Sequence, residues 1–289
     1  MSIITFWNYQ NVETGKTMSL VATATYMAVE HNVRTLIVST TNKRDKVKNC
    51  FLKEEKRSKI NLGIFGPNTK TFDTQTGLKG LEKVVRSGKL EPNTITNYTK
   101  VVFKDRLEIL LGEEEKEKET EVEKNELLKT YETYPDIISA ANSYYDRVFV
   151  DLDYNIPKEI RNKILQKSDI VVLSITQGMS GLETLRQNKE NDQLLKSPKT
   201  LLIIGRYDRY SKYNAKNITR FLKEKNTVLT TPYNTLFFEA SEEANVADLF
   251  LSLKKFNDPN DYNAFFRSEV KRTTENIIYR LQEIQANIY

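Results

Sequence analysis

Histidine and cysteine are almost missing from this chain, which carries one of each among 289 residues. A zinc centre built from several histidine and cysteine ligands is therefore excluded. A lone cysteine, Cys50, cannot form a disulfide within the chain, which fits a reducing compartment. A nucleophilic site with a histidine base would need His31, which falls between a helical segment and a strand segment. Ligands of parallel α/β sheets bind at the opposite sheet edge, so we expect His31 in a surface turn.

Long hydrophobic runs are also absent, since no run approaches the ~20 apolar residues that span a bilayer. The first residues lack the positive region and apolar stretch of a signal peptide. The net charge of +5 comes from a chain in which 29% of residues are charged and both signs are mixed. This excess is too small to predict a nucleic-acid binder. We expect a cytoplasmic protein.

What is present is an alternation of short apolar runs with helical segments. Runs rich in β-branched residues, apolar on both faces and separated by helices, are typical of a mostly parallel sheet covered on both sides. The sequence therefore predicts a doubly wound α/β fold, as one domain over residues 1–289. The predicted strands are 3–7, 35–39, 106–112, 147–153, 169–175, 200–205 and 227–231.

Three further segments stand out. Residues 77–90 have a helical pattern. The charge run 112–126 predicts a solvated loop or the exposed first turns of a helix, and an acidic docking surface is the alternative. Apolar residues recur at helical spacing in 261–288, where glutamates dilute the positive charge. We expect a C-terminal helix packed on the domain rather than a membrane anchor.

The motif with chemical meaning is Gly15-Lys16-Thr17, between the first predicted strand and a helix that runs to about Glu30. In this position the amides of a helix N-terminus point at a phosphate, and the helix dipole favours its negative charge. Lys16 would reach the β- and γ-phosphates, and the Thr17 hydroxyl would bind Mg²⁺. Asp151, at the end of a later strand, would supply a second contact to the metal.

The residues before this motif are unusual for a phosphate-binding loop, because Gln10, Asn11, Val12 and Glu13 fill places that often hold glycine. Val12 disfavours a positive φ, and Glu13 brings a carboxylate near a triphosphate. We expect an anion to sit at 15–17 with Glu13 turned away. In the alternative, Glu13 occupies the anion position and pairs with Lys16, so that the loop plugs itself.

With these motifs the chain resembles the ParA/MinD family of P-loop ATPases, whose deviant loop usually reads x-Lys-Gly-Gly-x-Gly-Lys-Thr. The likeness continues through 168–187, 200–221 and 231–253. Residues 77–90 with 106–112 are similar to the TadZ-like branch, which positions pilus and secretion machinery.

The resemblance implies ATP and Mg²⁺ as cofactors and a set of site residues. It implies Asp151 as the catalytic residue and Thr17 with Asp151 as metal ligands. The nucleotide-binding residues that it implies are Thr14, Gly15, Lys16, Thr17, Met18, Arg206, Pro232 and Tyr233.

The chain departs from the family at several positions. Asn11 stands where the signature lysine reaches across a dimer to the partner's nucleotide. Residues 39–41, Ser-Thr-Thr, replace the carboxylates expected after the second strand, one of which helps to activate water. Gly205 replaces an asparagine that commonly precedes the base-contacting segment. The departures predict a weak ATPase at most.

The resemblance further implies a homodimer that acts with a protein partner to position or assemble a larger machine, at the membrane periphery or a cell pole. The basic segment 42–59 is expected to be a solvated helix face, with non-specific DNA or an acidic membrane as the alternative contact. A non-catalytic scaffold that retains the fold, with weak or no ATP binding, is the alternative function.

Overall fold

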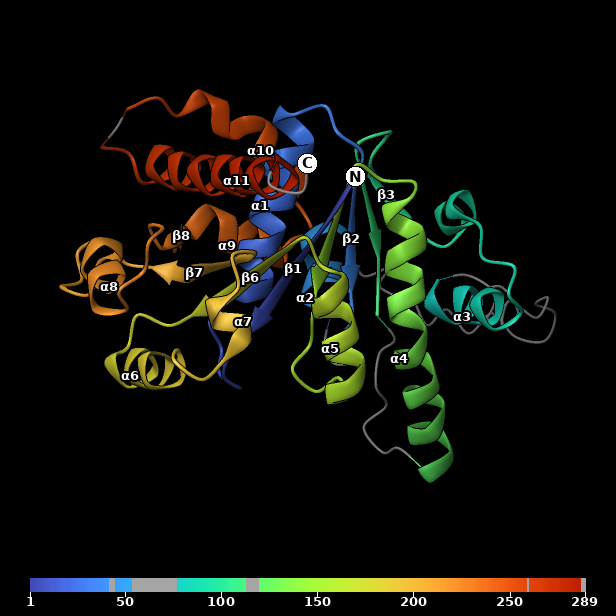
Figure 1. Ribbon diagram of the computed structural model, residues 1–289. Helices are drawn as coiled ribbons and strands as arrows, with labels where there is room; N and C mark the ends of the chain where they lie inside the picture. The colour runs from blue at the N-terminus through green and yellow to red at the C-terminus, as the bar shows by residue number, and fades with distance from the viewer. Residues whose placement is uncertain (42–44, 54–76, 113–119, 259, 287–289) are drawn as a thin grey trace.

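An eight-stranded sheet forms the centre of the protein, seen in a computed structural model that describes residues 1–41, 45–53, 77–112, 120–258 and 260–286. The strand order is β3-β4-β2-β5-β1-β6-β7-β8 (Figure 1). Every neighbouring pair is parallel except β3 and β4. The strands are β1 (Ser2–Asn8), β2 (Thr35–Ser39), β3 (Lys100–Phe103), β4 (Leu107–Leu110), β5 (Arg147–Asp151), β6 (Ile170–Ile175), β7 (Thr200–Tyr207) and β8 (Leu229–Pro232).

The central strand β1 shows why the sheet is covered on both sides. Successive side chains of a strand point to opposite faces. Ile4 and Phe6 belong to one core and Ile3 and Trp7 to the other, and all four are buried. Two separate hydrophobic cores therefore lie on the two faces, which confirms the doubly wound, mostly parallel fold predicted from the sequence.

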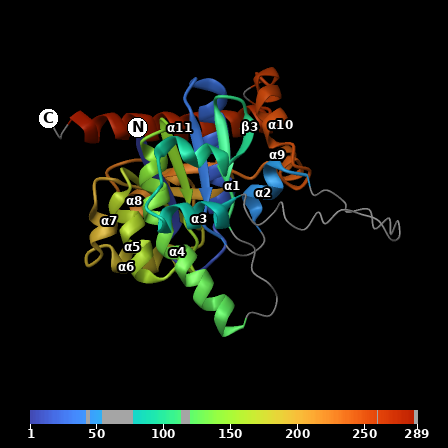
Figure 2. The same cartoon turned by 90° about the vertical axis from the view of Figure 1, so that its right-hand side faces the viewer.

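Helices form a layer on each face (Figures 1 and 2). One layer comprises α1 (Lys16–Glu30), α2 (Lys46–Phe51), α9 (Thr235–Glu242), α10 (Val246–Ser252) and α11 (Tyr262–Ala286). The other comprises α3 (Leu78–Arg86), α4 (Glu121–Asn142), α5 (Lys158–Lys167), α6 (Met179–Asn188), α7 (Gln193–Lys196) and α8 (Ala215–Phe221). Two short 3₁₀ helices are η2 (Pro92–Asn97) and η3 (Leu253–Lys255).

The predicted strands all appear in the sheet, but β3 was not predicted. It is a four-residue edge strand that pairs antiparallel with β4, and Val101 within it is exposed. A short, half-exposed strand lacks the apolar run that marks the buried strands.

The flanking segments take the following places. The charge run overlaps α4, which begins at Glu121 and whose first turns extend beyond the sheet in both views, while residues 113–119 lie outside the described residues. Of the basic segment 42–59, only 45–53 is described. Helix α11 packs on the sheet through four buried apolar residues, namely Phe266, Val270, Ile277 and Leu281.

His31 follows the last turn of α1, as expected, and its backbone N–H caps the helix by donating to the Met27 carbonyl. None of the described helices combines the length and the apolar character that crossing a bilayer would need.

Candidate functional site

The carboxyl ends of β1 and β5 meet at the middle of the sheet. These strands are adjacent and parallel, with Phe6 opposite Asp151. The loop that follows β1 therefore passes over the end of β5. Ligands of open α/β sheets bind at this edge of the strands.

Gly15 gives the loop its turn into α1. It is the residue before the helix, with φ 78° and ψ 18°, in the left-handed region that favours glycine. Having no side chain, it makes no capping hydrogen bond to the first turn. The first amides of a helix have no intrahelical acceptor, so those of α1 can donate to an anion.

Lys16, Thr17 and Asp151 form a tight cluster beneath the loop. The Lys16 Nζ lies 2.7 Å from Asp151 Oδ1 and donates to the Leu152 carbonyl at 2.6 Å. The Thr17 hydroxyl donates to Asp151 Oδ2 at 2.8 Å. The Lys16 and Asp151 side chains are 10% and 3% exposed. The side chain of Lys16 thus has protein partners of its own, and an incoming phosphate would compete with them.

The unusual residues of the loop are braced by Asn8 at the end of β1. The Asn8 amide donates to the Val12 carbonyl at 3.0 Å, and its oxygen accepts from the Thr14 hydroxyl at 2.6 Å. The Val12 N–H donates back to the Gln10 carbonyl at 2.8 Å. Hydrogen bonds from the Asn8 and Thr14 side chains therefore hold the loop in its conformation. A glycine-rich phosphate-binding loop would instead have a more flexible backbone.

Glu13 points away from Lys16. Its carboxylate lies 3.4 Å from Lys46 Nζ and 3.1 Å from an Arg206 guanidinium nitrogen. The charges of Lys46 and Arg206 hold the pKa of the Glu13 carboxyl below its usual value. The carboxylate that pairs with Lys16 belongs to Asp151, so the structure does not show the loop plugged by Glu13.

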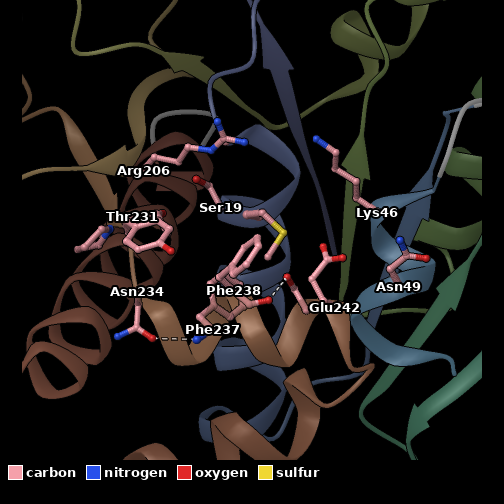
Figure 3. A pocket seen from close by; sticks show the side chains of 14 residues that line it. Ser19, Lys46, Asn49, Arg206, Thr231, Asn234, Phe237, Phe238 and Glu242 are labelled. Atoms are coloured by element: carbon pink, nitrogen blue, oxygen red, sulfur yellow. Dashed lines mark hydrogen bonds between the residues drawn. The ribbon is translucent and has the colours of Figure 1, made fainter.

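Two adjoining cavities open at this edge of the sheet. One, of about 340 Å³, lies over the loop and Asp151, and the other, of about 190 Å³, lies between α1, α9 and the end of β8 (Figure 3). They share Gly15, Met18, Lys46 and Arg206 in their linings. Every site residue predicted from the sequence lines at least one of them: Thr14, Gly15, Lys16, Thr17, Met18, Asp151 and Arg206 line the first, and Gly15, Met18, Arg206, Pro232 and Tyr233 line the second.

Gly205 holds the loop close to β7. A Cβ built on Gly205 would lie 2.3 Å from the Thr14 carbonyl oxygen and 3.0 Å from Gly15 backbone atoms. Any side chain here would push the loop away from the strand. The glycine in place of the family's asparagine is therefore explained by this close approach.

Some lining residues were not predicted from the sequence. Lys46 lines both cavities, and Asn49, Phe237 and Phe238 line the smaller one. They come from α2 and α9, whose segments stood out in the sequence by basic composition and by family likeness, but not by a motif that assigns single residues to a site. Helices α2 and α9 contact each other, and α2 also contacts α1, so these residues reach the site through tertiary packing.

Two buried hydroxyls in the smaller cavity lack a hydrogen-bond partner in the part of the chain that the structure describes. They are Ser19 Oγ and Thr231 Oγ1, and their residues are 0% and 3% exposed. Buried hydroxyls are costly to leave unpaired, so a water molecule or a polar ligand is expected to satisfy them.

A buried carboxyl, Asp45, lies close to the site without lining either cavity. It comes a few residues after the Ser-Thr-Thr at 39–41, which replaces the carboxylates expected after β2. Its Oδ1 accepts from the Val47 and Lys48 amides at the start of α2. Burial, and then the charge of Asp151, raise the Asp45 pKa to about 6. Asp45 therefore serves as a helix cap and adds no carboxylate to the cavity lining.

Comparison with known proteins establishes the fold. The chain matches no family model and no curated protein. It is similar in structure to a ParA family ATPase from Chlorobium tepidum TLS, with a TM-score of 0.61 and 15% identity over 93% of this chain and 96% of that one. It is also similar to MinD from Pyrococcus horikoshii OT3 in complex with Mg-ADP, with a TM-score of 0.61 and 14% identity over 96% and 98%.

A third similar structure is a plasmid partition protein from Borrelia burgdorferi B31 bound to AMPPNP. The TM-score is 0.54 with 18% identity, over 100% of this chain and 99% of that one. The likeness covers nearly the whole length of each chain, and the predicted ParA/MinD-like P-loop fold is confirmed. Identities this low carry the fold alone.

Proposed function

We propose that this chain, whose fold is that of the ParA and MinD ATPases, binds ATP with Mg²⁺ and uses the nucleotide to control its association with a second copy of itself. The observation that carries the proposal is the cluster of Lys16, Thr17 and Asp151 beneath a glycine that opens the N-terminus of α1. This combination supplies a cation, open amides and two oxygen ligands at one point.

The residues present suit a phosphate chain with Mg²⁺. In the proposed complex Lys16 would donate to the phosphates in place of the Leu152 carbonyl, and Thr17 and Asp151 would hold the metal. When bound, Mg²⁺ neutralises phosphate charge and polarises the terminal phosphoryl group. No group of three or more histidine, cysteine or acidic side chains in the described chain could hold a metal by itself. Mg²⁺ bound to nucleotides takes its other ligands from phosphate and water, so one carboxylate and one hydroxyl suffice.

The smaller cavity suits the nucleobase. Pro232 and Tyr233 line it beside Phe237 and Phe238, which offer apolar and aromatic surface. The unpartnered hydroxyls of Ser19 and Thr231 offer polar contacts at the edge of a base. MinD with Mg-ADP and the partition protein with AMPPNP are structural neighbours that hold nucleotides, which supports the same use of the fold here.

The proposed role is spatial positioning or assembly of a larger machine in the cytoplasm, through dimerisation and a protein partner. Val12 and Tyr154 line the larger cavity and are 44% and 38% exposed, so a second copy at this face would cover apolar surface. The TadZ-like branch rests on residues 77–90 and 106–112 and stays a prediction, as does contact with DNA or membrane.

Three features favour the alternative of a scaffold with little ATP binding. Asn11 replaces the signature lysine, Glu13 brings a carboxylate to the cavity, and Lys16 is already paired with Asp151. Each lowers the affinity expected for a polyanion.

Equilibrium binding of ATP separates the two functions. Affinity should be micromolar to sub-millimolar, should rise with Mg²⁺ and should fall in Lys16→Ala. Wild-type protein that binds no ATP at millimolar concentration, with or without Mg²⁺, would support the scaffold instead.

A further inference from the structure

Two cations stand at the junction between the cavities. Lys46 is the first residue of α2, and Arg206 lies near the end of β7. Both line both cavities. Figure 3 shows their charged ends pointing toward one another from opposite sides of the opening, with α1 between them. An anion that spans from one cavity to the other would pass between the two.

Glu13 is the group that now lies between these cations, 3.4 Å from Lys46 and 3.1 Å from Arg206. The three side chains are 70%, 53% and 54% exposed in the order Glu13, Lys46, Arg206. Exposed ion pairs of this kind contribute little to stability, so the fold does not depend on them. A ligand with a higher negative charge can displace the single carboxylate.

The charges of the larger cavity balance while Glu13 is in place. Its described lining has three carboxylates, those of Glu13, Asp151 and Asp153, against the cations Lys16, Lys46 and Arg206. The side-chain charges of the lining then give a polyphosphate no net attraction, and only the amides at the start of α1 favour it. If Glu13 withdraws, the lining becomes positive and Lys46 and Arg206 are free to bind phosphate oxygens.

Arg206 is held in this position by backbone conformation. Its φ of 54° is in the left-handed region, which a non-glycine residue adopts at a cost. The pairing of β7 with β8 shifts register between Gly205 and Tyr207, and Gly205 packs against the loop carbonyl of Thr14. The strained residue is therefore fixed directly beside the phosphate-binding loop.

We propose that Lys46 and Arg206 form a phosphate clamp within one chain, and that Glu13 is its built-in counter-ion, displaced when a polyphosphate binds. The clamp rests on the proposed nucleotide function and adds its regulation. Asn11 lacks the positive charge of the signature lysine, and the two cations supply positive charge from within the same chain. Glu13 sets how readily the site accepts a ligand.

The test compares the affinities of ATP with Mg²⁺, inorganic tripolyphosphate and adenosine for wild type, Glu13→Gln, Lys46→Gln and Arg206→Gln. Lys254→Gln is the matched control, because Lys254 is equally exposed at 52% and pairs with Glu30 at the far end of α1. We expect Glu13→Gln to tighten ATP and tripolyphosphate binding about threefold to tenfold. We expect Lys46→Gln and Arg206→Gln to weaken both by about as much.

Adenosine has no phosphate, so its affinity should stay within about twofold in Glu13→Gln and Lys46→Gln, and Lys254→Gln should match wild type. The double variant Glu13→Gln/Lys46→Gln should gain less than Glu13→Gln alone, since the carboxylate acts through the cations it holds.

Two results would overturn the clamp. One is tripolyphosphate affinity that is unchanged or weaker in Glu13→Gln. If Lys16→Ala still has weaker ATP affinity than wild type, the nucleotide function stands and only the clamp fails. The other is equal weakening by Lys254→Gln, which would indicate a general effect of charge. If no variant, Glu13→Gln included, binds ATP or tripolyphosphate, both the clamp and the nucleotide function fail.

Discussion

The Lys16 ammonium can bind either protein groups or the phosphates of a ligand. It now pairs with a nearly buried carboxylate, Asp151, and donates to the Leu152 carbonyl. A phosphate chain offers more negative charge than these partners, so the ammonium is expected to turn to the ligand. The ion pair with Asp151 then preserves the cluster when no nucleotide is bound.

Replacing Lys16 with alanine should weaken ATP binding by about 1.5–3 kcal/mol, or tenfold to a hundredfold, because a charge-assisted contact is lost. Calorimetric titration measures the affinity. Asp151→Asn is the matched variant, since it leaves Lys16 in place and should lose mainly the Mg²⁺-dependent part of the affinity. Thermal unfolding of both variants shows whether the fold survives. Unaltered ATP affinity in Lys16→Ala would remove the phosphate site from this residue.

ATP hydrolysis is expected to be slow because individual residues that would support it are replaced. Asn11 cannot give the cross-dimer charge of a lysine, and Ser39, Thr40 and Thr41 give no carboxylate to activate water. We predict turnover below roughly one per minute, far under the typical enzyme rate of about 10 s⁻¹. A steady-state phosphate-release assay that finds several turnovers per second would contradict this.

At the scale of elements, α2 is tied to the site by its cap. Asp45 is 2% exposed and has a pKa of about 6, raised from its ordinary value near 3.8. The folded protein thus binds this proton more tightly than the unfolded chain does. Stability contributed by the protonated carboxyl is present below about pH 4 and is lost as the pH rises toward 6.

Asp45→Asn keeps a side-chain oxygen for the cap and removes the charge. The variant should be more stable than wild type at pH 7, by about 2 kcal/mol, and the difference should shrink toward zero near pH 4. Urea unfolding at a series of pH values measures it. A difference that stays constant from pH 4 to pH 7 would show that the ionisation of Asp45 is not its cause.

The contact between β7 and the loop gives another prediction at this scale. A methyl group at Gly205 would overlap the Thr14 carbonyl, so Gly205→Ala should displace the loop. We expect at least tenfold weaker ATP binding and a loss of about 1–3 kcal/mol in stability. Gly178→Ala is the control, because a Cβ there meets only the Thr176 hydroxyl at 3.8 Å, an ordinary contact. If Gly205→Ala and Gly178→Ala have the same ATP affinity and stability, the close approach at Gly205 is not needed for nucleotide binding.

For the whole molecule, the prediction concerns association. Exposed Val12 and Tyr154 line the larger cavity, so a nucleotide bound as proposed and a second copy would meet at one face. We expect sedimentation to show a monomer without ligand and a dimer with ATP and Mg²⁺, and Lys16→Ala to stay monomeric under both conditions. A mass that does not change in saturating ATP would argue against nucleotide-dependent dimerisation.

The buried strands and the main helices could be predicted from the sequence because each is marked locally. A run such as 35–39 is apolar on both faces, and α11 repeats its apolar residues at helical spacing. The edge strand β3 escaped prediction because two of its four residues are exposed and none is buried, so it has no buried apolar run. Among site residues, Lys16, Thr17 and Asp151 could be found by motif and strand position. Lys46, Asn49 and Phe238 could not, because the basic composition of 42–59 and the family likeness of 231–253 do not mark which of their side chains face the site.

The sequence by itself determined where the seven buried strands and the main helices follow one another along the chain, and where the Gly15-Lys16-Thr17 motif lies between them. Hydrophobic periodicity and a glycine at a strand-to-helix turn are local signals that act over a few residues. Only the tertiary structure decided which charges meet. Glu13 pairs with residues 33 and 193 positions away, and these partners come from α2 and β7. Such contacts depend on how distant elements pack against the loop, and a pairing over that separation leaves no local pattern in the chain.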